Sequence, residues 1–159
     1  MNIRLAGQPR PDVSDVPETS HVSVFPTEFK GVKPRLLVKE GDSVKRGTPL
    51  FLNKLNESFQ GCAPASGTIE SIQLGLRRVV EQIIIKRDGQ DTAEPFGAYP
   101  PGKCKTINRQ KILDQLQQTG YLAYIRQRPF SCIPDPSVTP KSIFVNAMAT
   151  APFQTDFAV

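Results

Sequence analysis

The chain has 159 residues, of which 38% are hydrophobic and 22% are charged. This length suits one domain or slightly more and can bury a core, and the composition excludes a largely disordered chain. The formal net charge is +5. Since no run of five or more like charges marks a nucleic-acid-binding arm, we expect no nucleic-acid partner.

Within the first ninety residues, the sequence pattern changes at about residue 21. Residues 1–20 contain Pro9, Pro11 and Pro17 and little periodicity, and they predict an extended lead-in. Residues 21–90 hold short apolar segments separated by glycine turns, so we predict one domain built from short strands. The strands are predicted around 21–24, 36–38, 49–52, 68–72 and 79–86, with a tight loop at 39–47. This pattern is typical of a small β-sandwich or barrel.

The remainder of the chain has a different pattern. Residues 91–106 are polar and rich in proline and glycine, and they predict a linker. A helix follows, with Asn108 as its N-cap and Gly120 at its C-terminal end. Its apolar face would be formed by Ile112, Leu113 and Leu116. Residues 121–125 would add a turn, residues 129–140 would be irregular, and residues 143–148 would form a buried strand. Residues 107–159 therefore predict the helix and first strand of a truncated α/β domain.

Residues that could hold a metal or perform catalysis are few and scattered. Cys62, Cys104 and Cys132 form no CxxC pair, and His21 is the single histidine. A zinc or iron–sulfur site thus lacks ligands in this chain. The Gly-rich phosphate-binding motifs are missing as well. We expect no cofactor bound by this chain, no metal and no independent catalysis. The apolar runs are far shorter than the ~20 residues of a membrane-spanning helix.

Two motifs in the strand-rich part indicate a particular fold. They are the glycine turn at residues 38–47 and the Ala-Pro-x-x-Gly element at residues 63–67. Together they resemble the biotinyl/lipoyl fold, a barrel-sandwich hybrid. A carrier of this fold needs a modified lysine, but counting back from Gly67 places Asn56 in that position. A gapped alignment would bring Lys54 into it. We favour a scaffold without a prosthetic group over a swinging-arm carrier.

Two basic segments are candidate contact sites. Arg77 and Arg78 follow Gly75 on a predicted hairpin, where they would be solvated surface or would contact a polar head group or a neighbouring subunit. Arg128 and Phe130 lie in a proline-rich loop. This loop is either a rigid connector or a quinone site, in which the aromatic ring would cover the quinone and the guanidinium would donate to a carbonyl oxygen. Lys33 and Arg35 are secondary candidates for the same cleft.

Taken together, the motifs are similar to those of the A subunit of the sodium-translocating NADH:quinone reductase. The stretches that carry the resemblance are 5–9, 31–34, 38–47, 50–51, 63–67, 77–79, 126–130 and 139–148. Two segments depart from the family pattern. Residues 149–152 read Ala-Thr-Ala-Pro in place of Asp-Thr-Asn-Pro, and residues 120–122 read Gly-Tyr-Leu in place of Gly-Leu-Trp. These put in doubt any role for the acid or the tryptophan.

The resemblance implies a peripheral subunit on the cytoplasmic face of the bacterial inner membrane, bound to membrane-embedded partners. It implies that quinone is a substrate of the complex, that this subunit carries no flavin or iron–sulfur centre, and that the chain continues beyond residue 159. Two alternatives stay open. One is the C subunit of an Rnf-type electron-transport complex, which would carry ferredoxin-like cysteine clusters later in its chain. The other is an unmodified biotinyl/lipoyl-like scaffold module or a stand-alone carrier.

Overall fold

The computed structural model describes residues 7, 14–55, 57, 59–100, 102 and 106–146. The chain forms two compact units, of which one is Thr19–Val138 and the other combines Met1–Glu18 with Thr139–Val159. In the second unit, the described residues 7, 14–18 and 139–146 contain no helix or strand. All regular structure described below therefore belongs to the unit Thr19–Val138.

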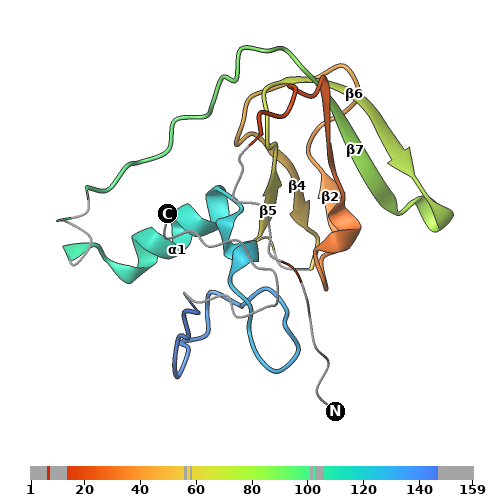
Figure 1. The fold of residues 1–159 in the computed structure, drawn as a ribbon. Coiled ribbons are helices and arrows are strands. Elements are labelled where there is room, and N and C mark those ends of the chain that lie inside the picture. Colours follow the sequence, from red (N-terminus) through yellow and green to blue (C-terminus); the bar gives the residue numbers. More distant parts are fainter. Residues whose placement is uncertain are drawn as a thin grey trace. The chain divides into compact units, whose positions relative to one another are not determined.

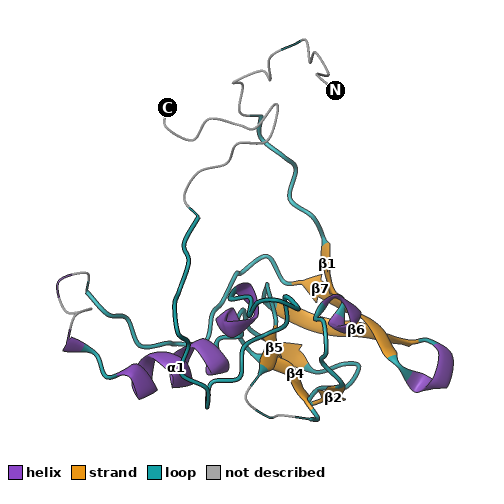
Figure 2. Ribbon diagram, turned by 90° about the horizontal axis from the view of Figure 1, so that it is seen from below, coloured by secondary structure: helices purple, strands orange, loops and turns teal. Residues whose placement is uncertain are grey.

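Within that unit, the described residues form seven strands in two antiparallel sheets (Figures 1 and 2). One sheet has the order β1-β7-β6-β3, and the other has the order β2-β4-β5. The strand bounds are β1 His21–Val24, β2 Pro34–Leu36, β3 Ser43–Val44, β4 Pro49–Asn53, β5 Gln60–Cys62, β6 Gly67–Leu74 and β7 Val80–Arg87. Two short 3-10 turns, η1 Pro26–Glu28 and η2 Leu76–Arg78, lie between strands. This architecture confirms the predicted barrel-sandwich fold class.

The two sheets share one apolar core because alternate side chains of their strands point inward. On β7, Ile83 and Ile85 are fully buried and the residue between them is less so. Phe51 of β4 is also fully buried, and its ring meets those of Phe29 and Phe59 at centroid distances of 5.8 and 6.3 Å. Val44, which lies within the predicted 39–47 loop, is buried as well. The strand predictions over residues 21–90 are thus largely confirmed, except that β3 and β5 were not predicted and that β2 begins and ends two residues earlier than the predicted strand at 36–38.

The part of the chain just after the barrel is more closely attached to it than the sequence suggested. The Arg46 N–H donates to the Thr92 carbonyl, and the Glu94 N–H donates to the Arg46 carbonyl, both at 2.9 Å. The Thr48 hydroxyl also donates to the Glu94 carboxylate at 2.9 Å. The predicted linker at 91–106 is therefore wrong at its start. Residues 92–94 form hydrogen bonds with the barrel because the N–H and the carbonyl of Arg46 need backbone partners, which Thr92 and Glu94 supply.

A helix and a turn follow, as predicted. Helix α1 spans Arg109–Gln118, and the Asn108 side chain caps it by accepting from the Gln110 N–H at 2.9 Å. Gly120 has φ 74° and ends the helix in the left-handed conformation that glycine favours. The turn η4, Tyr121–Tyr124, buries Leu122 and Ala123, and Ala123 joins the barrel core. None of the described helices is long and apolar enough to cross a membrane.

The strand predicted at residues 143–148 is not present in its described part. Residues 143–146 are irregular, and Ile143, Phe144 and Val145 are exposed rather than buried. Residues 147 and 148 lie outside the described residues. An isolated apolar segment is not a strand unless another strand completes its hydrogen bonds. Since no described strand pairs with residues 143–146, the prediction is wrong for them.

The packing of the Phe51 ring against Gly61 allows a direct test of the core. A Cβ atom at Gly61 would lie 2.2 Å from the Phe51 ring, and that ring is fully buried and cannot move aside. We expect Gly61→Ala to lower the free energy of unfolding by roughly 1–3 kcal/mol, as overpacked cores do. Gly97→Ala is the matched control, because a Cβ there meets no atom within 4 Å and the glycine has no positive φ. Denaturant unfolding of both variants measures the difference, and equal stabilities would contradict this packing.

Candidate functional site

The loop at residues 126–135, called the quinone-candidate loop below, lies against the barrel. It begins after η4 and is closed by an antiparallel bridge in which the Gln127 N–H donates to the Cys132 carbonyl at 2.9 Å. The Lys30 ammonium donates to the Phe130 carbonyl at 2.9 Å, and Ile133 packs on the barrel core. One polar contact and one apolar contact therefore hold this loop beside residues 30–32, although it is about a hundred residues away in sequence.

A small cavity separates the loop from the barrel. Its volume is about 130 Å³, which is below the roughly 300 Å³ at which ligand pockets begin. It combines apolar walls with one ammonium, one amide and one carboxylate. The lining residues are Lys30, Gly31, Val32, Asn53, Phe59, Cys132, Ile133, Pro134 and Asp135. As it stands, the cavity has room for a small part of a ligand, and a larger ligand would need the loop to move outward.

The structure brings together the two segments that carry the predicted quinone residues. Arg128 and Phe130 belong to the loop. Lys33 directly follows the barrel residues 30–32, which line the cavity, and Arg35 lies two residues further along the chain. None of these four side chains lines the cavity. The Phe130 side chain is 73% exposed, so it does not fill a gap in the apolar core.

The two secondary candidates have different partners. The Arg35 guanidinium forms an exposed ion pair with Glu57 at 2.7 Å. The backbone of Lys33 is fixed by two hydrogen bonds, from its N–H to the Asn53 amide oxygen at 3.1 Å and from the Lys54 N–H to its carbonyl at 2.7 Å. Lys33 is therefore held by its backbone at the start of the turn between β4 and β5. Arg35 would have to leave Glu57 to reach a ligand.

Sequence reasoning missed two residues of this site. Lys30 makes the direct contact with the loop, and Asp135 supplies a carboxylate to the cavity. Hydrogen bonds from the Ser137 hydroxyl and N–H lower the pKa of Asp135, so this group is negatively charged at neutral pH. The Asp-x-Ser spacing that makes these bonds is visible in the sequence. The contact of Lys30 across the fold has no local signal.

The hairpin between β4 and β5 is where a carrier of this fold would present its lysine. Lys54 lies in the turn directly after β4, and its N–H is the donor to Lys33 described above. Asn56, which occupies the ungapped lysine position, lies outside the described residues. The hairpin therefore carries a lysine near the carrier position, although the sequence around it lacks the carrier motif.

The thiols and other possible metal ligands are dispersed. Cys62 and Cys132 are free and half-buried, and Cys104 lies outside the described residues. Across the described ranges, no three His, Cys, Asp or Glu side chains are grouped so as to hold a metal ion. The Cys62 thiol lies 3.4 Å from the Gln118 carbonyl at the end of α1, and burial raises its pKa to about 11. A thiol that keeps its proton is a poor metal ligand and a poor nucleophile.

Two small antiparallel sheets around one core, followed by a capped helix, define a barrel-sandwich hybrid. Residues 1–88 match the family model of the NqrA N-terminal barrel-sandwich hybrid domain, and residues 107–159 match that of the NqrA second alpha/beta domain. The chain belongs to the NqrA family, the A subunits of the Na⁺-translocating NADH-quinone reductase. This finding confirms the resemblance inferred from the motifs and does not favour the Rnf-type alternative.

Curated relatives agree with the family models. The A subunit from Teredinibacter turnerae is 37% identical over 156 residues, which are 98% of this chain and 35% of that protein. The A subunit from Neisseria meningitidis serogroup B is 38% identical over 156 residues, with the same coverage. That of Pseudomonas aeruginosa is 35% identical over the same length. The chain thus spans about a third of the length of the curated relatives it matches.

The environment of Cys62 predicts an unusual reactivity profile. Since the thiolate is the reactive form, alkylation of folded Cys62 by iodoacetamide should be slow near pH 8 and should keep accelerating up to about pH 11, the pKa set by burial. The rate at this residue is measured by peptide mass spectrometry over that pH range. In concentrated denaturant the same cysteine should react much faster at pH 8. A folded-state rate that levels off near pH 9 would contradict the burial of this thiol under α1.

Proposed function

We propose that this chain is part of the A subunit of a sodium-translocating NADH:quinone reductase and works there as a scaffold. The observation that carries the proposal is the ordered match of both family models over residues 1–88 and 107–159. The barrel fold and the packed end of α1 supply a rigid body on which a complex can assemble. In this role the chain supports respiratory electron transfer from NADH to quinone, coupled to sodium export, and performs no redox step with its own residues.

The chemistry of the described residues supports a scaffold without a redox group of its own. Cys62 keeps its proton because of burial, and it donates to a backbone carbonyl of α1. The buried Ser66 hydroxyl donates to Asp88 at 2.6 Å and accepts from the Thr92 N–H at 3.1 Å. Its hydrogen bonds join the end of β7 to the segment after the barrel. These groups are used for structure, and redox centres would be held by other subunits.

We further propose that the quinone-candidate loop takes part in quinone binding together with the barrel segment at residues 30–35. The supporting geometry is the contact of Lys30 with the Phe130 carbonyl and the cavity beside it. Phe130 is exposed and could cover an apolar ring. Arg128 could donate to a quinone carbonyl, because its guanidinium carries five N–H donors. Lys33 and Arg35 would complete the polar side of the same site.

The protein is proposed to be peripheral, on the cytoplasmic face of the bacterial inner membrane, and bound to membrane-embedded subunits of the same complex. The direct test is purification of the tagged protein from mildly solubilised membranes of its native host. We expect membrane subunits to co-purify together with NADH:quinone reductase activity. The intact mass of the purified protein should equal that of the bare polypeptide. An added lipoyl or biotinyl mass would favour the carrier alternative, and the absence of any membrane partner would contradict the proposal.

The quinone proposal predicts a loss of affinity in two variants. Arg128→Ala removes a charged hydrogen bond worth roughly 1.5–3 kcal/mol, so we expect quinone to bind about ten- to a hundredfold more weakly. Phe130→Ala should weaken binding as well, because the quinone ring loses its apolar cover. Equilibrium binding of a soluble short-chain quinone to the intact subunit measures both effects.

Lys45→Ala is the matched control for the lost cation, since Lys45 is exposed in the turn between β3 and β4, outside the loop and the cavity. This variant should bind quinone like the unaltered protein. Circular dichroism checks that all variants are folded. Unchanged affinity in both Arg128→Ala and Phe130→Ala would leave the loop as a structural connector.

A further inference from the structure

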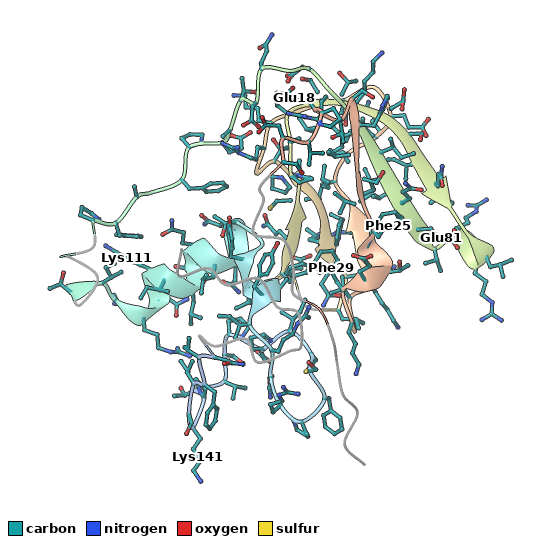
Figure 3. The ribbon with its side chains drawn as sticks, viewed as in Figure 1. Glu18, Phe25, Phe29, Glu81, Lys111 and Lys141 are labelled. Atoms are coloured by element: carbon teal, nitrogen blue, oxygen red, sulfur yellow. The ribbon has the colours of Figure 1, made fainter. Side chains whose placement is uncertain are left out.

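A tight turn just after η1 brings one cation to the cavity beside the quinone-candidate loop. The Val32 N–H donates to the Phe29 carbonyl at 3.0 Å, and Gly31 has φ 82°, as the third residue of a type II turn requires. Phe29, labelled in Figure 3, packs its ring against that of Phe59 at a centroid distance of 5.2 Å. Lys30 therefore extends from a turn that the apolar core holds in place.

The Lys30 ammonium has hydrogen-bonding capacity to spare. Lys30 is the residue with a cationic side chain among those that line the cavity. Its ammonium donates to the Phe130 carbonyl at 2.9 Å, and none of the ion pairs between described residues involves it. Because an ammonium carries three N–H donors, two are left for another acceptor. The flexible four-carbon stem lets the ammonium follow the loop if the loop moves outward.

The other polar residues that line the cavity favour a neutral ligand with carbonyl oxygens. The Asn53 amide oxygen accepts from the N–H groups of Lys33 and Leu55 at 3.1 and 3.2 Å. Its NH₂ group is therefore a second donor, and it has no acceptor in the described part of the chain. The Asp135 carboxylate, which also lines the cavity, would repel an anionic group. The cavity thus suits a neutral carbonyl and disfavours a phosphate or a carboxylate.

We propose that Lys30 binds the quinone directly, with one N–H on a carbonyl oxygen of the quinone and another on the Phe130 carbonyl. This inference rests on the proposed function and adds a residue that touches the ligand. One side chain then joins the ligand, the loop and the barrel. A benzoquinone has carbonyl oxygens on opposite sides of its ring, so the oxygen nearer the barrel meets Lys30 and the other stays available to Arg128.

The competing role is a purely structural one, in which Lys30 holds the loop and never touches a ligand. Two ligands separate these roles. The first is dimethoxy-dimethyl-benzoquinone, whose fully substituted ring does not add to the cysteine thiols. The second is the corresponding dimethoxy-xylene, which has the same substituents but no carbonyl oxygen. A hydrogen bond from Lys30 to the ligand strengthens binding of the first alone, whereas a change in the position of the loop affects both.

The test compares two variants of the intact subunit with the unaltered protein. Lys30→Met removes the ammonium and keeps a flexible apolar stem. Lys45→Met is the matched control, because it makes the same change at an exposed lysine in the turn between β3 and β4, outside the loop and the cavity. Equilibrium binding of each ligand is measured for all three proteins, and thermal unfolding is recorded in parallel.

We expect the unaltered protein and Lys45→Met to prefer the quinone over the ring without carbonyl oxygens. Lys30→Met should bind the quinone roughly tenfold or more weakly and the carbonyl-free ring as before. Unchanged binding of that ring also shows that the site is still folded.

Two kinds of contrary result are distinguishable. Equal weakening of both ligands in Lys30→Met, or an undiminished preference for the quinone, would overturn the direct role of Lys30 and leave the proposed function standing. Failure of the unaltered protein to bind the quinone would overturn the quinone proposal and this inference with it.

Discussion

The packing of the Phe51 ring is the constraint on which the rest of the structure depends. Phe51 is fully buried between the two sheets, and it can enter only because Gly61 on the neighbouring strand has no side chain. Phe29 and Phe59 close around it. Phe29 leads directly into residues 30–32, and Phe59 lines the small cavity. The core thus fixes the barrel face on which the quinone-candidate loop lies. A shift of one of these rings would therefore move residues of the candidate site.

Much of the barrel follows from local patterns in the sequence. The glycine turn at 38–47, the alternating segment around Val22 and the isoleucines of β7 all predict their elements, as does the Asn108 cap of α1. β5 was missed because Gln60–Cys62 has no β-branched or aromatic residue. It is a strand only because Gly61 fits beneath Phe51 and its backbone pairs with β4. That reason is a tertiary contact.

The sequence predicted which segments form the candidate site, but it did not predict the contacts between them. Family motifs identified residues 31–34 and 126–130, and the structure brings their neighbourhoods together through Lys30 and the Phe130 carbonyl. The cavity is lined by other residues, such as Cys132 and Asp135. Their proximity depends on the Gln127–Cys132 bridge and on Ile133 packing onto the core. Neither interaction leaves a periodic or compositional trace in the sequence.

A barrel used as a scaffold would carry the proposed quinone-associated loop on one of its faces. The most direct test of this account is hydrogen–deuterium exchange of the protein within the intact complex, with and without quinone. We expect residues 30–35 and 126–135 to become protected together when quinone binds, while residues 74–79, in the turn between β6 and β7, are unaffected by quinone. Protection of neither segment, or of some other surface of the barrel alone, would contradict the quinone-associated role of the loop.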